Sequence, residues 1–394
     1  MLRIIIILCV VSTTFGQTKY QKDFDIYWKT IDTYFGYFDT QETNWNKVKE
    51  YYGPKVREIQ NDDDFIALLE RTNLELYNGH VGLNVNRASS YKLVPSSSDI
   101  SIRYKDNKYI INGLREGSPS EKAGLKLGMV ITGVNDISIH KTVQQYLPVS
   151  TNEFTPQMHE YLANMILAGT HDTKRSINVN DSLTFYPDDT KWNSSKDLIT
   201  TKRLENNIGY IKINNSLGNN HTIKAFDKAL DQLNTSKGII LDLRETPSGG
   251  DSNIARGIMG RFIDKELPYQ IHTFPYEEKM YDTTRKTIEL VVPRGKTYTG
   301  TLIVLCGPWT GSMGEGITIG FDAMERAEIV GAKMAGLLGA IYDNTLPETR
   351  IGFQIPVEKL FHVNGMPREK FVPKYYEQDT QGQLEKAIEL INSL

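Results

Sequence analysis

Hydrophobic positions over residues 22–77 recur at intervals of three and four, which predicts helices. The last of these helices begins at Asp62–Asp64, where negative charge suits the helix dipole. Its apolar face is formed by Phe65, Leu68, Leu69 and Leu76. Asn78-Gly79 then predicts a turn, and Val81–Val85 a short strand. We therefore expect a helical N-terminal domain over residues 17–90.

The pattern changes between residues 91 and 188, where short apolar runs alternate with turn residues. Lys108–Asn112 predicts a strand, Gln157–Leu167 a helix, and Arg175–Phe185 closing strands. Tyr146–Phe154 has the character of an insertion. We expect this segment to form a second, smaller domain.

From residue 189 to residue 394 strand and helix patterns alternate. Strands are predicted at 208–213, 238–243 and 302–305, and helices at 222–233, 253–263 and 314–327. Strand, helix and strand in succession predict parallel strands, with the functional residues at the strand ends.

The length of the chain indicates more than one domain, and its composition is typical of soluble globular proteins. The chain has 394 residues, of which 39% are hydrophobic and 24% charged. Its formal net charge of -3 gives no reason to expect nucleic acid as a partner.

The first residues predict a secretory signal peptide over 1–16. Arg3 is followed by an apolar run and then by small residues, with cleavage expected after Gly16. A membrane anchor is the alternative, but the run is about half as long as a bilayer requires. We expect an exported, periplasmic or extracellular protein without a membrane span. Cleavage leaves Cys306 as the single cysteine, expected to be a buried core residue, with a catalytic thiol as the less favoured alternative.

Two segments carry candidate chemistry. In Thr301–Glu315 an apolar run ends in a glycine-rich turn with Ser312, directly before a predicted helix. Backbone N–H groups and the helix dipole at such a junction can stabilise an oxyanion, which predicts a serine nucleophile. In Asp242–Gly250 a strand runs into a turn with paired glycines, which allow close approach of the backbone to a ligand.

A third segment, Gly117–Asn135, resembles the PDZ signature in the order of its glycines, Ala-Gly-Leu helix and apolar strand. The order of PDZ unit, Asp-Leu-Arg with Gly-Gly, and Gly-Ser-X-Gly-Glu resembles the C-terminal processing (tail-specific) protease family. This resemblance implies a multidomain α+β fold: a helical N-terminal domain, a PDZ-like domain over 91–188 and a crotonase-like α/β core of ββα repeats over 189–394. It also implies oxyanion donors at Met313 and at Gly249 or Gly250. The Glu245-Thr-Pro-Ser loop is longer than is usual in that family.

The resemblance also bears on the general base. In the Ser-Lys branch of the family a lysine follows the serine by about 25 residues, whereas this chain has Leu337 there, and Lys333 lies off the pattern. The branch similar to the tricorn core protease takes a histidine from a Gly-His turn after the N-terminal helices, which implies His80. That branch also uses a late glutamate before Val-Pro, which implies Glu369. We interpret Glu315 as a helix-capping residue.

We therefore predict a serine endopeptidase that cleaves protein or peptide substrates, with no metal and no cofactor. An inactive protease-like protein that binds peptides or apolar ligands is the main alternative, and a hydrolase of non-peptide acyl groups is a third. The PDZ-like unit is expected either to recruit peptide by strand addition or to have a structural or gating role. The sequence leaves the oligomeric state open.

Overall fold

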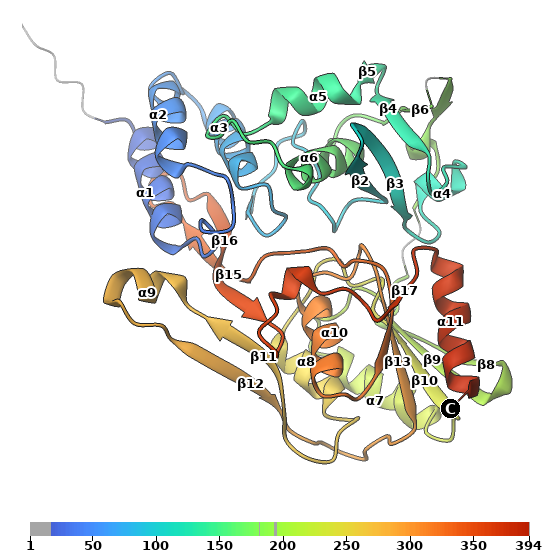
Figure 1. Cartoon of the computed structure of the whole chain (residues 1–394). Coiled ribbons are helices and arrows are strands. Elements are labelled where there is room, and N and C mark those ends of the chain that lie inside the picture. The colour runs from blue at the N-terminus through green and yellow to red at the C-terminus, as the bar shows by residue number, and fades with distance from the viewer. Residues whose placement is uncertain (1–16, 181, 193–194, 394) are drawn as a thin grey trace, which may run out of the picture.

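The computed structural model describes residues 17–180, 182–192 and 195–393 (Figure 1). It is a mixed helix and sheet structure in several parts. The N-terminal helices are α1 (Lys19–Tyr34), α2 (Trp45–Val56) and α3 (Asp62–Asn73), followed by the 3₁₀ turn η1 (Leu74–Leu76). They confirm the helical pattern of the sequence. The proposed signal peptide over 1–16 lies outside the described residues.

A second part, at the top of Figure 1, is an antiparallel sheet in the order β2-β3-β4-β6-β7. Its strands are β2 (Ile100–Lys105), β3 (Lys108–Leu114), β4 (Val130–Val134), β6 (Ile177–Val179) and β7 (Leu183–Phe185), with β5 (Ile137–Ser138) paired to β4. Its helices are α4 (Pro119–Lys122), α5 (Ile139–Tyr146) and α6 (Pro156–Ala168). Helix α6 packs against the edge strand β2, so the two elements enclose one hydrophobic core.

The third part has a sheet in the order β17-β14-β13-β10-β9-β8. The strands are β8 (Ile199–Leu204), β9 (Ile208–Ile213), β10 (Gly238–Asp242), β13 (Thr301–Cys306), β14 (Glu328–Gly331) and β17 (Tyr375–Tyr376). All neighbours are parallel except β8 and β9, which confirms the predicted parallel strands. Short 3₁₀ turns η2 (Pro187–Asp189) and η3 (Glu205–Asn207) precede β8 and β9, respectively.

Alternate side chains of the central strand β10 enter two different cores. Ile239 and Leu241 pack with helices α7 (Thr222–Gln232), α8 (Ser252–Met259) and α10 (Met313–Ala323), whereas Ile240 packs on the other face with α11 (Thr380–Ser393). Helix α10 ends at Ala323, earlier than the predicted residue 327, because Glu325 has a left-handed φ of 50° that a continuing helix cannot contain.

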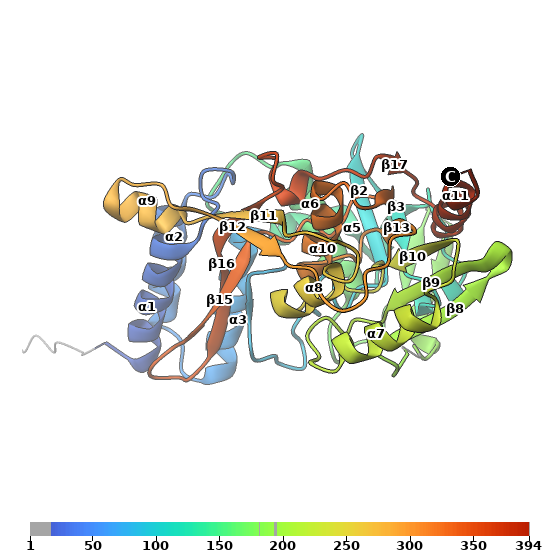
Figure 2. The ribbon, with the colours of Figure 1, turned by 90° about the horizontal axis from the view of Figure 1, so that it is seen from below.

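A further sheet, in the order β1-β16-β11-β12 with β15 paired to β16, joins the first part to the third. Its strands are β1 (Gly82–Leu83), β11 (Leu267–Thr273), β12 (Lys286–Val291), β15 (Ala340–Thr345) and β16 (Gly352–Phe361). Helix α9 (Pro275–Tyr281) lies beside α1 in both views, and Tyr276 contacts Tyr34 at a ring distance of 5.5 Å (Figures 1 and 2).

This joining sheet changes how the parts divide. The sequence assigns β15 and β16 to the third domain, yet Phe353 and Ile355 of β16 pack with Tyr27 and Ile31 of α1 in one core. The predicted strand over 81–85 is reduced to β1, which pairs with β16. None of the helices in the part of the chain that the structure describes is long and apolar enough to cross a bilayer.

Candidate active site

Ser312 lies at the junction that the sequence predicts, between strand β13 and helix α10. It occupies the N-cap position of α10 with φ 51° and ψ -109°, and its side chain is half-buried. A positive φ is unfavourable for a serine, so the surrounding turn must hold it in place. The same sharp turn places the hydroxyl beside the unpaired N–H groups of the first helical turn.

Glu315 stabilises this turn through hydrogen bonds to its carboxylate. Its fully buried carboxylate accepts a hydrogen bond from the Ser312 N–H (2.8 Å) and another from the Gly336 N–H (2.9 Å). Burial raises the pKa of Glu315 to about 7, although the nearby Arg368 opposes the shift. Glu315 therefore caps the helix, as the sequence suggested, and also ties the serine turn to the loop after β14.

The loop after β10 is hydrogen-bonded directly to the serine turn. The Thr246 N–H donates to the Trp309 carbonyl (3.1 Å), and the Gly311 N–H donates to the Thr246 carbonyl (3.2 Å). The two glycine-containing loops, at the ends of the adjacent parallel strands β10 and β13, therefore form one rigid unit.

Gly249 lies against the serine. A Cβ at this position would be 2.3 Å from Ser312 Cβ and 2.7 Å from Ser312 Oγ, and its φ is 64°. The Gly249 N–H donates to Thr246 within the turn (3.2 Å). Among the described residues, neither the Gly250 N–H nor the Met313 N–H has a hydrogen-bond acceptor, so both are available to a ligand.

The Asp-Leu-Arg segment before this loop has a structural role that the sequence did not reveal. Arg244 and Tyr210 both donate to the buried Asp242 carboxylate, at 2.6 Å each to its Oδ2. Burial raises the pKa of Asp242, but the charge and hydrogen bonds of Arg244 outweigh it and lower the pKa to about 2. Arg244 also donates to the Thr380 carbonyl, which fixes the end of β10 to α11.

His80 lies in the turn between η1 and β1 and is 5% exposed. Its Nδ1 is 2.6 Å from the Leu338 carbonyl oxygen. Because a carbonyl can only accept, Nδ1 carries the proton and Nε2 keeps its lone pair. Burial, and next the positive charge of Arg368, lower the pKa of His80 to about 4, so the imidazole is neutral at pH 7.

His80 and Ser312 come from distant parts of the sequence but reach the same loop, Gly336–Gly339. The Leu337 side chain would lie 2.9 Å from a Cβ on Gly79 and 3.2 Å from one on Gly311, so it contacts both turns. Within the described residues no hydrogen bond joins His80 Nε2 to Ser312 Oγ. The structure thus brings the two turns together without closing a proton path between them.

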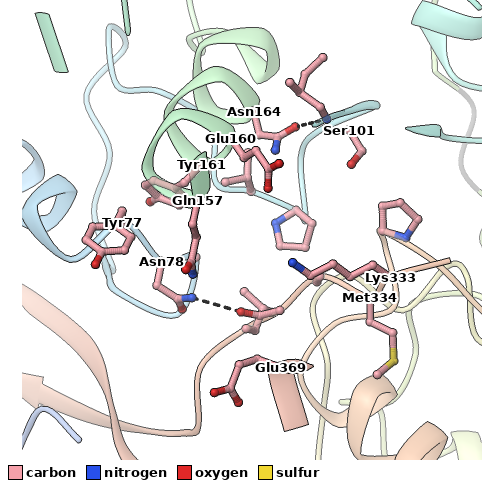
Figure 3. A pocket seen from close by; sticks show the side chains of 18 of the residues that line it. Tyr77, Asn78, Ser101, Gln157, Glu160, Tyr161, Asn164, Lys333, Met334 and Glu369 are labelled. Carbon is pink, nitrogen blue, oxygen red and sulfur yellow. Dashed lines mark hydrogen bonds between the residues drawn. The ribbon is translucent and has the colours of Figure 1, made fainter. Parts of the chain in front are cut away.

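Glu369 lies in the 3₁₀ turn η4 (Arg368–Lys370) and is half-buried. It lines a cavity of about 380 Å³ whose wall also includes Asn78, Glu160 and Lys333 (Figure 3). The position beside His80 Nδ1 is occupied by Leu338 and not by Glu369. The cavity adjoins the His80 turn through Asn78 and Gly79, and its wall includes neither His80 nor Ser312.

The edge of the sheet in residues 91–188 is closed along this cavity. The Ile102 N–H donates to Asn164 Oδ1 at 3.0 Å (Figure 3). The Tyr104 N–H donates to Glu160 Oε1, also at 3.0 Å. Side chains four residues apart on α6 match the spacing of N–H groups two residues apart on β2, since both rises are about 6–7 Å. A peptide strand adding to β2 would have to displace both side chains.

The surroundings of Cys306 and Lys333 do not favour a catalytic role for either residue. Cys306 is fully buried at the end of β13, and burial raises the pKa of its thiol, which confirms it as a core residue. Lys333 is exposed and therefore not desolvated as a lysine base would have to be. No group of three or more metal-ligating side chains occurs in the described ranges.

Comparison with protein families gives two matches. Residues 207–373 match Peptidase family S41, and residues 17–72 match the Tricorn protease C1 domain. The first range contains Ser312 and both glycines of the neighbouring loop, and the second contains the helices that precede His80. Comparison with curated protein sequences finds no match.

Solved structures give a consistent likeness of fold. The chain is similar to a photosystem II D1 C-terminal processing protease, with a TM-score of 0.58 and 15% identity over 94% of this chain and 97% of that one. It is similar to mature CPAF complexed with lactacystin, with a TM-score of 0.64 and 12% identity over 95% and 99% of the two chains. The tricorn protease matches at a TM-score of 0.50 and 16% identity, over 95% of this chain and 37% of that one.

Proposed function

We propose that Ser312 is the nucleophile and His80 the general base of an endopeptidase. The family and structural matches support a serine-type peptidase as the class of enzyme. The observation that carries the proposal is the packing of Gly249 against the Ser312 side chain at the start of α10. That contact brings the Gly249 backbone close to both the Ser312 hydroxyl and the Met313 backbone nitrogen.

The reaction follows from these positions. Ser312 Oγ attacks the scissile carbonyl carbon while its proton passes to His80 Nε2. The tetrahedral intermediate collapses to an acyl-enzyme, and the imidazolium returns the proton to the leaving amine. Water, deprotonated in turn by His80, then hydrolyses the ester and releases Ser312. Because Nε2 and Oγ are not hydrogen-bonded here, the proposal requires the two turns to approach each other when substrate binds.

The oxyanion is proposed to bind two backbone donors. Met313 N–H is the first, since it follows the nucleophile and points from the positive end of α10. For the second donor we favour Gly250 over Gly249, because the Gly249 N–H is already bonded to Thr246. Gly249 is required for a different reason: its missing side chain leaves the room that Ser312 occupies.

The orientation of the base is proposed to come from the Leu338 carbonyl. It fixes the tautomer of His80 in the way that a carboxylate does in other serine peptidases. We therefore assign no orienting role to Glu369, whose place is in the wall of the adjoining cavity.

The proposed substrate is a protein or peptide, and the test is direct. The purified protein is incubated with an unstructured protein and, separately, with a fluorophosphonate that labels activated serines. Cleavage together with labelling of Ser312 is expected. Binding of peptide with neither cleavage nor labelling would instead favour an inactive binding protein, and turnover of simple esters alone would favour a non-peptide hydrolase.

The pH dependence of kcat/KM is predicted to reflect the buried histidine. The base form of His80 exists above its pKa of about 4 and is lost as the pH falls through that value. Loss of the base form of His80 should therefore lower kcat/KM tenfold per pH unit below about 4, a limb distinct from any change near pH 7 that the titration of Glu315 brings. Circular dichroism at each pH separates this loss from unfolding. The absence of an acid limb near pH 4 would contradict the proposed state of His80.

Gly249→Ala is predicted to lower kcat by about 10²-fold, the cost expected when a reacting group is displaced by roughly 1 Å. The added Cβ would overlap Ser312 at 2.3 Å and must push the hydroxyl from its place. Gly117→Ala is the matched control, because its φ is also positive (66°) and its Cβ would meet nothing within 4 Å. Equal activity in the two variants would remove Gly249 from the site.

We further propose that the protein is exported, on the basis of its first sixteen residues. For residues 91–188 we propose a PDZ-like unit whose role is structural or gating. The closed β2 edge supports this choice over free strand addition, because Asn164 and Glu160 already occupy the N–H groups that a peptide would use.

A further inference from the structure

The loop Gly336–Gly339 is held from two sides through its backbone. The Gly336 N–H donates to Glu315 (2.9 Å), and the Leu337 carbonyl accepts from the buried Arg368 (2.8 Å). The next carbonyl, that of Leu338, accepts from His80 Nδ1 (2.6 Å). Next to position 337, where a Ser-Lys peptidase would have its lysine, a backbone carbonyl of this chain therefore binds a histidine from another part of the sequence.

Asn78 completes the attachment of the histidine turn to this loop. Its Oδ1 accepts from the His80 N–H (3.0 Å) and from the Leu338 N–H (3.3 Å), while its Nδ2 donates to the Gly336 carbonyl (3.3 Å; Figure 3). The side chain is 5% exposed, so water cannot readily replace these bonds. One planar amide thus connects the backbone of the base to the backbone of its receptor.

We propose that Asn78 is the positioning residue that sets His80 against Ser312. The inference rests on the proposed roles of those two residues and adds how both of their turns are attached to the loop Gly336–Gly339. Glu315 bonds both the Ser312 N–H and the Gly336 N–H, so the loop moves with the nucleophile. Asn78 then attaches His80 to the same loop. A continuous series of hydrogen-bonded contacts therefore connects the serine turn to the histidine turn. It runs through Glu315, the loop Gly336–Gly339 and Asn78.

An asparagine is the side chain that this position requires. The site presents two N–H groups and one carbonyl, which an amide satisfies with one acceptor and one donor group. Leucine has a similar shape but leaves all three backbone groups without a side-chain partner. Aspartate keeps the acceptor for His80 and Leu338, loses the donor to Gly336, and places a negative charge 3.0 Å from the His80 backbone nitrogen.

The experiment compares Asn78→Leu and Asn78→Asp with the unmodified protein, using a quenched fluorescent peptide that the unmodified protein cleaves. Asn78→Leu is expected to lower kcat by about 10²-fold, as for a base displaced by roughly 1 Å, with KM changed less than threefold. Asn78→Asp is expected to retain more of kcat and to move the acid limb of the pH profile upward, since a carboxylate favours the protonated imidazole. A general loss of packing would not shift that limb.

The matched control is Asn164→Leu, which lines the same cavity and also bonds a backbone N–H but does not touch the loop. It is expected to leave kcat within twofold. If Asn78→Leu and Asn78→Asp both keep kcat and the pH profile while His80→Ala loses activity, the positioning role is wrong and the proposed function stands. If His80→Ala itself keeps kcat, the proposed base is wrong and the inference falls with it. Should Asn78→Leu fail to fold, the aspartate variant decides through its pH profile.

Discussion

Ser312→Ala is expected to reduce peptide hydrolysis by about 10⁵–10⁶-fold in kcat, the loss typical when the nucleophile of a serine peptidase is removed. The free Met313 and Gly250 N–H groups remain, so binding of the substrate carbonyl persists and KM should change little. Stability should fall by about 1 kcal/mol, the usual cost of an N-cap serine, because the bond from the Ser312 N–H to Glu315 is retained. Turnover of the fluorescent peptide and thermal unfolding provide the two measurements.

Ser248→Ala is the control for this variant. Ser248 is exposed in the same loop as Gly249 and bonds only Asn215 and Ser96 among the described residues, so its removal should leave kcat within twofold. Loss of fluorophosphonate labelling in the Ser312 variant alone would support the nucleophile. Cleavage that survives Ser312→Ala, with the peptidase freed of contaminants, would refute it.

His80→Ala is expected to reduce kcat by about 10⁴–10⁶-fold, since nucleophile and base act as a unit. Neither Lys333 nor Glu315 is placed to take over, since Lys333 is exposed and the Glu315 carboxylate accepts from two backbone N–H groups. The acid limb of the pH profile should disappear with the imidazole. Added imidazole is expected to restore part of the activity, because the substitution leaves room beside the Leu338 carbonyl.

The control for His80 is His362, which is also 5% exposed and whose Nε2 lies 3.2 Å from Asp322. His362→Ala should lower stability by an amount similar to that of His80→Ala but leave kcat per folded molecule unchanged. An equal loss of kcat in the two variants would mean that the effect of His80 is structural. Failure of imidazole to rescue, together with an unchanged acid limb, would point to another base.

Much of the fold was predictable because local patterns decide it. The alternation of apolar runs predicted β9, β10 and β13 and their parallel order, and the helical period predicted α1 to α3. The arm formed by β11, α9 and β12 was not predicted. Its exposed apolar residues, such as Ile288 and Leu290, interrupt the usual pattern of one buried and one solvated face.

The candidate site was predictable to the extent that its residues follow strand ends or sit in marked turns. Ser312 and the Gly-Gly loop meet both conditions, and the structure brings them into contact. Asn78 was interpreted as part of a turn, since the dipeptide Asn-Gly commonly forms turns and gives no sign of a further role. Arg368 gave no local signal at all. Its burial among the carbonyls of residues 337 and 339 is a property of the folded chain.

The sequence by itself determined which chemistry is present: a serine before a helix, paired glycines after a strand, a histidine in a turn, and no lysine at position 337. Only the tertiary structure decided which of these residues lie close to one another. The spacing of hydrophobic residues along the sequence predicts a single helix or strand and the face that it buries. Contacts between residues more than 200 positions apart depend instead on which of these faces pack against each other. Here β16 packs on α1 and pairs with β1, and this pairing carries His80 to the loop that Glu315 ties to Ser312.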